Sequence, residues 1–161
     1  MSNENNIVTE NDFYFCGRPD NRLFNEAYDY IQHNPEIPKK IKSKLFLTSI
    51  ELINNFICHA EKNADSSFRI NQQNNNYILE TSNPCSELNY RIIESKLLTL
   101  RRLDNIDDHI QDLLKQSNES DSVQLGMAFL FDKSLNNCSV TREIINDILF
   151  VKFKIIVNAT S

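Results

Sequence analysis

Glu51, Asn55 and His59 are the residues of this chain whose types and spacing best suit a chemical role. They recur every four positions, and steps of four drift by only about 40° around a helix of roughly 3.6 residues per turn. A carboxylate, an amide and an imidazole would therefore share one helical face. Such a set on a single helix is most often solvated surface, so its meaning depends on the elements around it.

The segment that carries these side chains, residues 44–63, has a strong helical period. Apolar residues recur on another face at spacings of four and three, the pattern of a stripe that packs on a core: Phe46, Ile50, Ile53 and Ile57. We expect the helix to begin at Pro38, because proline suits a first helical turn, and to end near Asn63 to Ser66.

Four lysines crowd the first half of this helix, where a helix N-terminus favours acidic residues: Lys39, Lys40, Lys42 and Lys44. They predict either a solvated face or a docking patch for an acidic partner, and the sequence leaves both open.

Turn signals and periodicity divide the rest of the chain into short elements. Before the helix we expect a strand at 12–16, closed by Gly17, and a helix that runs to about residue 32. After it we expect a hairpin whose strands, at 67–72 and 76–81, are joined by a loose polar connection.

Further helices and a closing hairpin complete the expected order. The helices cover about 86–103, 107–116 and 123–135, and strands at 138–144 and 148–158 flank a turn at Asn146-Asp147. This order predicts an α+β fold, a two-layer sandwich in which helices cover one face of a mixed, mostly antiparallel sheet.

The composition is that of one acidic domain. The chain has 161 residues, 40% of them hydrophobic, and a formal net charge of −5. This length fills one core without disulfides, so we expect a single domain over 12–161 after a disordered segment at 1–11. A nucleic-acid partner normally requires a basic excess, which this chain lacks.

No apolar run is long enough to cross a bilayer, and the first residues lack the pattern of a signal peptide. We therefore expect a cytoplasmic protein with no membrane partner. The four cysteines lie far apart, which favours reduced thiols over a zinc or redox site: Cys16, Cys58, Cys85 and Cys138.

The segment ELINNFICHA, Glu51 to Ala60, resembles the N box of the GHKL superfamily of ATPases and kinases. From about Asp12 to Asn158 the layout is similar to that of the SiaB family of small bacterial protein kinases. Thr81-Ser82-Asn83 matches the small residue and Asn after the second strand. LGMAFLFDKS, Leu125 to Ser134, resembles a glycine-rich helix start, although only Gly126 remains of its glycines.

The resemblance implies a Bergerat-type ATP site. Asn55 would hold Mg²⁺ between the phosphates, and Glu51 would accept a proton from an attacking hydroxyl or orient that hydroxyl. His59 would flank the phosphates or fix the helix against the lid. Asn83 would receive the adenine amino group, where the superfamily usually has Asp, and the backbone at Gly126 would meet the phosphates.

Two functions follow from this resemblance. One is an ATP- and Mg²⁺-dependent kinase that phosphorylates Ser or Thr of a small partner protein in a bacterial partner-switching pathway. The alternative is a non-catalytic adaptor that uses the same fold to hold a regulatory partner, with a second copy of itself as a possible neighbour.

Overall fold

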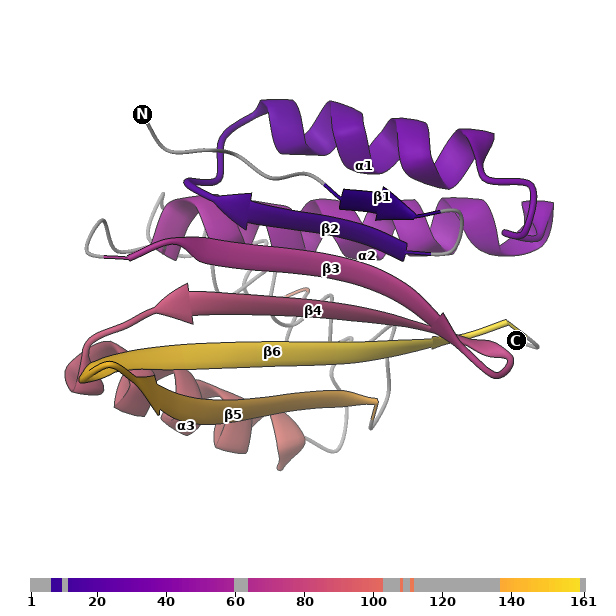
Figure 1. The fold of residues 1–161 in the computed structure, drawn as a ribbon. Helices are drawn as coiled ribbons and strands as arrows, with labels where there is room; N and C mark the ends of the chain where they lie inside the picture. Colours follow the sequence, from indigo (N-terminus) through magenta and orange to yellow (C-terminus); the bar gives the residue numbers. More distant parts are fainter. Residues whose placement is uncertain are drawn as a thin grey trace.

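A sheet with helices packed on it forms the part of the chain that the structure describes (Figure 1). The computed structural model describes residues 7–9, 12–59, 64–102, 108, 111 and 137–159. The strands are β1 (Ile7–Thr9), β2 (Asp12–Gly17), β3 (Ser66–Gln73), β4 (Asn76–Pro84), β5 (Cys138–Ile145) and β6 (Ile148–Asn158). The helices are α1 (Arg22–His33), α2 (Lys39–His59) and α3 (Glu87–Arg101).

The sheet has the strand order β1-β2-β3-β4-β6-β5, and every neighbouring pair is antiparallel. The predicted α+β class with an antiparallel sheet is confirmed, whereas the prediction of a mixed sheet is wrong for the described strands. Short hairpins join β3 to β4 and β5 to β6, and a two-residue connection allows only antiparallel neighbours.

The two hairpin turns owe their shape to Asn and Asp, which tolerate positive φ better than other non-glycine residues. Asn146 and Asp147 have φ of 50° and 62°, as a tight hairpin turn requires, and this turn lies where the sequence predicted it. The predicted loose connection between β3 and β4 is wrong. Gln73 pairs with Asn76, so the turn has two residues, and Asn74 adopts φ 55°.

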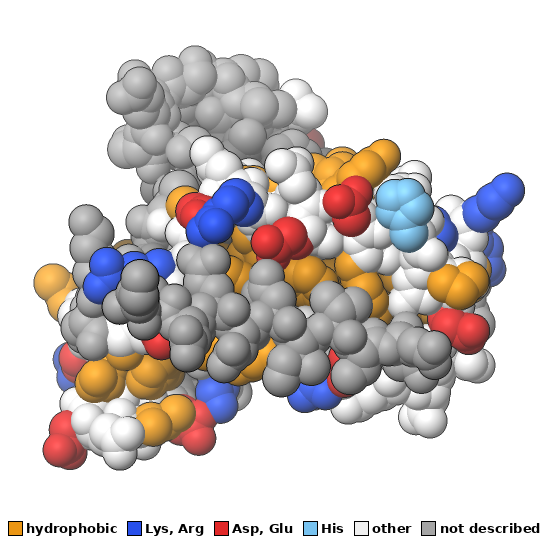
Figure 2. Space-filling model, turned by 45° about the horizontal axis from the view of Figure 1, so that its top comes forward, with side chains coloured by type: hydrophobic (Ala, Val, Ile, Leu, Met, Phe, Trp, Pro, Cys, Tyr) orange, Lys and Arg blue, Asp and Glu red, His pale blue; other side chains and the backbone are white. Residues whose placement is uncertain are grey.

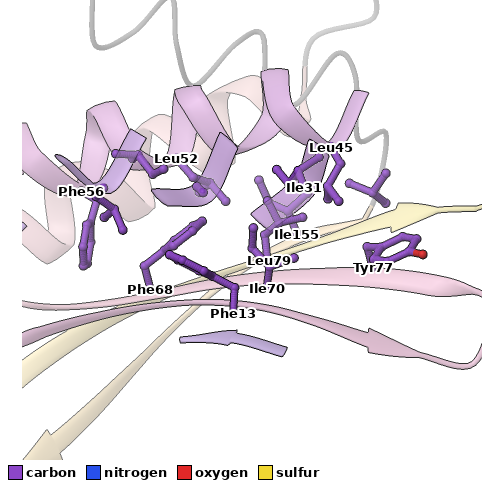
Figure 3. Packing of buried hydrophobic residues seen from close by; sticks show 14 of the residues in the cluster. Phe13, Ile31, Leu45, Leu52, Phe56, Phe68, Ile70, Tyr77, Leu79 and Ile155 are labelled. Carbon is purple, nitrogen blue, oxygen red and sulfur yellow. The ribbon is translucent and has the colours of Figure 1, made fainter. Parts of the chain in front are cut away.

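The main core lies between the sheet and the helices α1 and α2, as Figure 3 shows. Alternate residues of the strands point into it, among them Phe13, Phe68 and Leu79. The Tyr77 hydroxyl donates to the carbonyl of Glu36 at 3.0 Å, which ties β4 to the connection between the helices. One layer of helix and one of sheet thus bury a common apolar interior.

The buried face of α2 differs from the predicted one. Ile53 is buried as expected, but Phe46, Ile50 and Ile57 are only half-buried. The buried residues of α2 within its described side chains are Ile41, Leu45, Thr48, Ser49, Leu52, Ile53 and Phe56. Because α2 carries apolar residues on more than one side, its periodicity allowed several faces, and packing on the sheet selected this one.

Lys42 closes the C-terminal end of α1. Its ammonium donates to the carbonyls of Gln32 at 2.5 Å and Asn34 at 3.1 Å, where a helix end leaves carbonyls without helical partners. Lys39 and Lys40 are exposed. The lysine cluster therefore includes a structural residue, an option that the sequence did not raise.

Several element boundaries differ from the predictions. Residues 7–9 form β1, although the sequence predicted disorder through residue 11. The helix end was predicted near Asn63 to Ser66. Its upper bound is wrong, because Ser66 belongs to β3, whereas residues 60–63 lie outside the described ranges. The predicted helices at 107–116 and 123–135 lie outside the continuous described ranges.

Among the described side chains, Cys16, Cys85 and Cys138 are not in disulfides. Burial raises the pKa of the Cys138 thiol to about 11, so this thiol stays protonated near neutral pH. The side chain of Cys58 is not among those that the structure describes.

The other face of the sheet is polar. A cross-strand row places Tyr14, Arg69, Glu80 and Lys154 side by side.

On the face that Figure 2 shows, acidic and basic side chains are interspersed with hydrophobic ones among the described residues. Within the described ranges, none of the helices is both long and apolar enough to span a bilayer.

Candidate functional site

A pocket of about 140 Å³ lies between α2 and α3, above β4 and β6. Its walls are mostly apolar, formed by Leu52, Phe56, Ile92, Ile93, Val151 and Phe153. Its polar lining includes two residues that the sequence analysis selected, Asn55 and Asn83. Mostly apolar walls with few polar groups are typical of small-molecule sites.

Asn55 reaches the pocket because it flanks the buried face of α2. Its neighbour Phe56 is buried and packs against Phe15 and Phe68 on the sheet, with ring centroids 6.2 Å and 6.3 Å away. These aromatic contacts hold this turn of α2 on the strands. Asn55 is half-buried, and no hydrogen bond of its side chain is seen within the described part of the chain.

Asn83 is a polar residue on the inner face of β4. This face begins with the buried Tyr77 and Leu79 and then continues with Thr81 and Asn83. Asn83 is 5% exposed, and its Nδ2 donates to the carbonyl of Phe56 at 3.5 Å. Its Oδ1 is buried and has no hydrogen-bond partner among the described residues.

A buried acceptor without a partner costs about 1–3 kcal/mol and is uncommon in folded proteins. Asn83 also lines the pocket, so a ligand with an N–H or O–H donor would supply the missing partner. The long Nδ2 contact to Phe56 orients the amide so that the oxygen remains available.

Asn83 lies within β4, whereas the sequence placed it after the strand. The pairing of β3 with β4 ends at Ser82, but β4 continues against β6, with Asn83 opposite Val151 and Pro84 opposite Phe150. Proline lacks an N–H donor and is tolerated where a strand is paired on one side only. The extra pairing makes Asn83 part of a rigid strand.

Lys96 is the charged residue among the described lining side chains, and it was not among the residues predicted from the sequence. It is half-buried on α3, and no salt bridge of its ammonium is seen within the described ranges. The signal was present in the sequence, because Lys96 follows Ile92 by four positions and Ile93 by three and so shares their apolar face.

Glu51 is half-buried on α2, one turn before Asn55, and is absent from the described lining of this pocket. The structure describes α2 as far as His59, but the side chain of His59 lies outside the described set, as does Gly126. The structure thus gives positions for Asn55, Asn83 and Glu51, and the roles predicted for all five residues stay predictions.

A comparison with protein-family models finds no match, and a search of the curated proteins finds none either.

A second hollow, of about 300 Å³, lies on the opposite, polar face of the sheet. Its cations are paired with carboxylates: Arg69 with Asp12 at 2.7 Å, Lys154 with Glu80 at 3.7 Å, and Lys152 with Glu143. Burial raises the pKa of the Tyr14 hydroxyl beside it. None of its described lining residues has a buried polar atom without a partner, which favours the smaller pocket as the ligand site.

Proposed function

We propose that the chain is a SiaB-like protein kinase that binds ATP with Mg²⁺ in the pocket between α2 and α3. It would transfer the terminal phosphate to Ser or Thr of a small partner protein in a bacterial partner-switching pathway. The observation that carries this proposal is the convergence of Asn55 and Asn83 on one pocket, where the Asn83 oxygen is buried and unpartnered.

The pocket suits the base of the nucleotide. The adenine amino group donates hydrogen bonds, and the Asn83 Oδ1 is a buried acceptor without a partner among the described residues. The apolar walls would contact the faces of the flat ring. A volume of about 140 Å³ is below the roughly 300–1,000 Å³ of whole-ligand sites, so the interior of the pocket would hold the base, and the phosphates would extend out past its rim.

Asn55 would supply an amide oxygen to Mg²⁺, which prefers oxygen ligands and keeps several waters. Among the described residues no group of three or more His, Cys, Asp or Glu is placed to hold a metal ion. Asn55 would therefore act together with the phosphates of the nucleotide. Glu51, one turn earlier on α2, would accept the proton of the partner's hydroxyl as its oxygen bonds to the terminal phosphorus and ADP leaves.

Calorimetric titration with a non-hydrolysable ATP analogue and Mg²⁺ tests this function. We expect saturable binding that Asn55→Ala weakens by about tenfold or more, because the variant loses an oxygen ligand. Asn54→Ala is the matched control, since Asn54 is exposed on the same helix and does not line the pocket. Absence of binding at millimolar analogue, with the protein folded, would refute the kinase proposal.

The adaptor remains the alternative, and one feature favours it. Large apolar side chains are exposed on α3 and β5, such as Leu88 at 69% and Ile144 at 71%, and such residues suit protein docking. An adaptor would keep its partner when Glu51 and Asn55 are both changed to Ala, and it would show no transfer of phosphate from labelled ATP.

A further inference from the structure

Among the described residues, Lys96 has no salt-bridge partner that explains its place in the pocket wall. The residues three and four positions away on α3 carry no acid, so a salt bridge along the helix is not available: Ile92, Ile93, Thr99 and Leu100. The ion pairs of α3 within the described ranges involve Glu87 with Arg91 and with Arg142 instead.

The polar groups of the pocket differ in depth. Asn83 is buried at the level of the sheet, whereas Asn55 on α2 and Lys96 on α3 are half-exposed. The two helices therefore bring an amide and an ammonium to the rim, above an acceptor at the floor. No carboxylate is among the described lining residues, so the positive charge of Lys96 is not neutralised within the wall.

We propose that Lys96 binds a phosphate group of the ligand and thereby makes the pocket selective for a phosphorylated nucleoside over the free nucleoside. This inference rests on the proposed nucleotide function and adds a specificity residue to it. An ammonium offers three donors on a compact charge, which suits phosphate oxygens, and apolar walls strengthen its field relative to bulk water.

A purely structural role for Lys96 makes a different prediction. The four-carbon stem of a lysine covers apolar surface while its charge stays in water, so Lys96 could serve only to cover Ile92 and Ile93. In that role the stem matters and the charge does not. A methionine at this position keeps most of the stem and removes the charge, which separates the two roles.

The experiment measures binding of ATP with Mg²⁺, AMP without metal, and adenosine to the full chain and its variants by calorimetry. For Lys96→Met we expect affinity for ATP and AMP to fall by about tenfold, with adenosine changed by less than about twofold. Lys96→Arg should retain most of the affinity for the phosphorylated ligands. Lys40→Met removes the same charge from an exposed site outside the pocket and should change none of the three.

The outcomes separate this inference from the function on which it rests. If the unaltered chain binds none of the three ligands, the proposed nucleotide function is wrong and the inference falls with it. If ATP, AMP and adenosine bind but Lys96→Met weakens all three equally or none, nucleotide binding stands and the phosphate role of Lys96 is overturned. Loss confined to ATP and AMP supports the inference.

Discussion

Asn83 illustrates how a single residue can be costly for stability and useful for binding. Its buried oxygen has no partner among the described residues, although a leucine of similar size would fill the same space without a polar atom. Such a residue is retained at a cost to the folded state, which is common at binding sites.

At this scale we predict that Asn83→Leu leaves the free energy of unfolding unchanged or raises it by about 1 kcal/mol, because the unsatisfied acceptor is removed. The same variant should lose binding of the ATP analogue. Urea denaturation and calorimetry measure the two effects. A loss of stability of about 1 kcal/mol or more would instead mark Asn83 as a structural residue.

Asn71 supplies the matched control for this prediction. It is 7% exposed on β3, its Oδ1 is also buried without a partner in the described part of the chain, and it does not line the pocket. Asn71→Leu should therefore give a similar change in stability and leave nucleotide binding intact.

At the scale of the element, the junction between α1 and α2 determines how α2 enters the fold. The Lys42 ammonium binds the last carbonyls of α1, and the Asn34 Oδ1 accepts from the backbone N–H of Glu36 at 2.9 Å. These contacts hold the connection between the two helices, and α2 in turn carries Asn55.

We predict that Lys42→Met lowers the free energy of unfolding by about 1–2 kcal/mol, because two carbonyls at the end of α1 lose a charged donor. Lys40→Met, which changes an exposed lysine two residues earlier, should stay within about 0.5 kcal/mol of the unaltered chain. Urea denaturation of both variants tests this. Equal stability of the two would show that Lys42 is solvated like its neighbour.

The N-terminus of α3 has a capping residue that the sequence already indicated. The Ser86 hydroxyl accepts from the backbone N–H of Asn89 at 3.2 Å, which caps the helix at the residue that the sequence predicted as its start. Arg142 on β5 contacts Glu87 at 3.2 Å and lies over the Tyr90 ring at 5.5 Å, so α3 is also held to the sheet.

At the scale of the whole molecule, the strand order places β4 between β3 and β6, and β1 and β5 at the edges. Backbone amides of a central strand open only when a large part of the sheet opens, whereas edge strands open locally. The ligand pocket is built on β4 and β6, so its floor lies on strands that have a neighbour on both sides.

We therefore predict that amide hydrogen exchange is slowest in β4 and β6, for example at Leu79 and Ile155, and fastest in β1. Exchange followed by NMR under native conditions measures this. Protection of β5 equal to that of β4 would contradict the described edge, and would indicate that another strand or chain covers β5.

The sequence by itself determined the features that depend on neighbouring residues. The helices α1 and α3, the two hairpins and the turn at Asn146-Asp147 follow from periodicity, capping and turn chemistry, which act over a few positions. It also selected Asn55 and Asn83, because a local motif marks them.

Only the tertiary structure decided the features that depend on distant partners. The pairing of β4 with β6 extended β4 through Asn83, and packing on the sheet chose the buried face of α2. The approach of α3 placed Lys96 in the lining of the pocket that Asn55 also lines. Local patterns permit several helix faces and strand ends equally, and long-range packing selects among them. The sequence could therefore predict individual residues of the pocket, whereas the pocket itself is defined only by the fold.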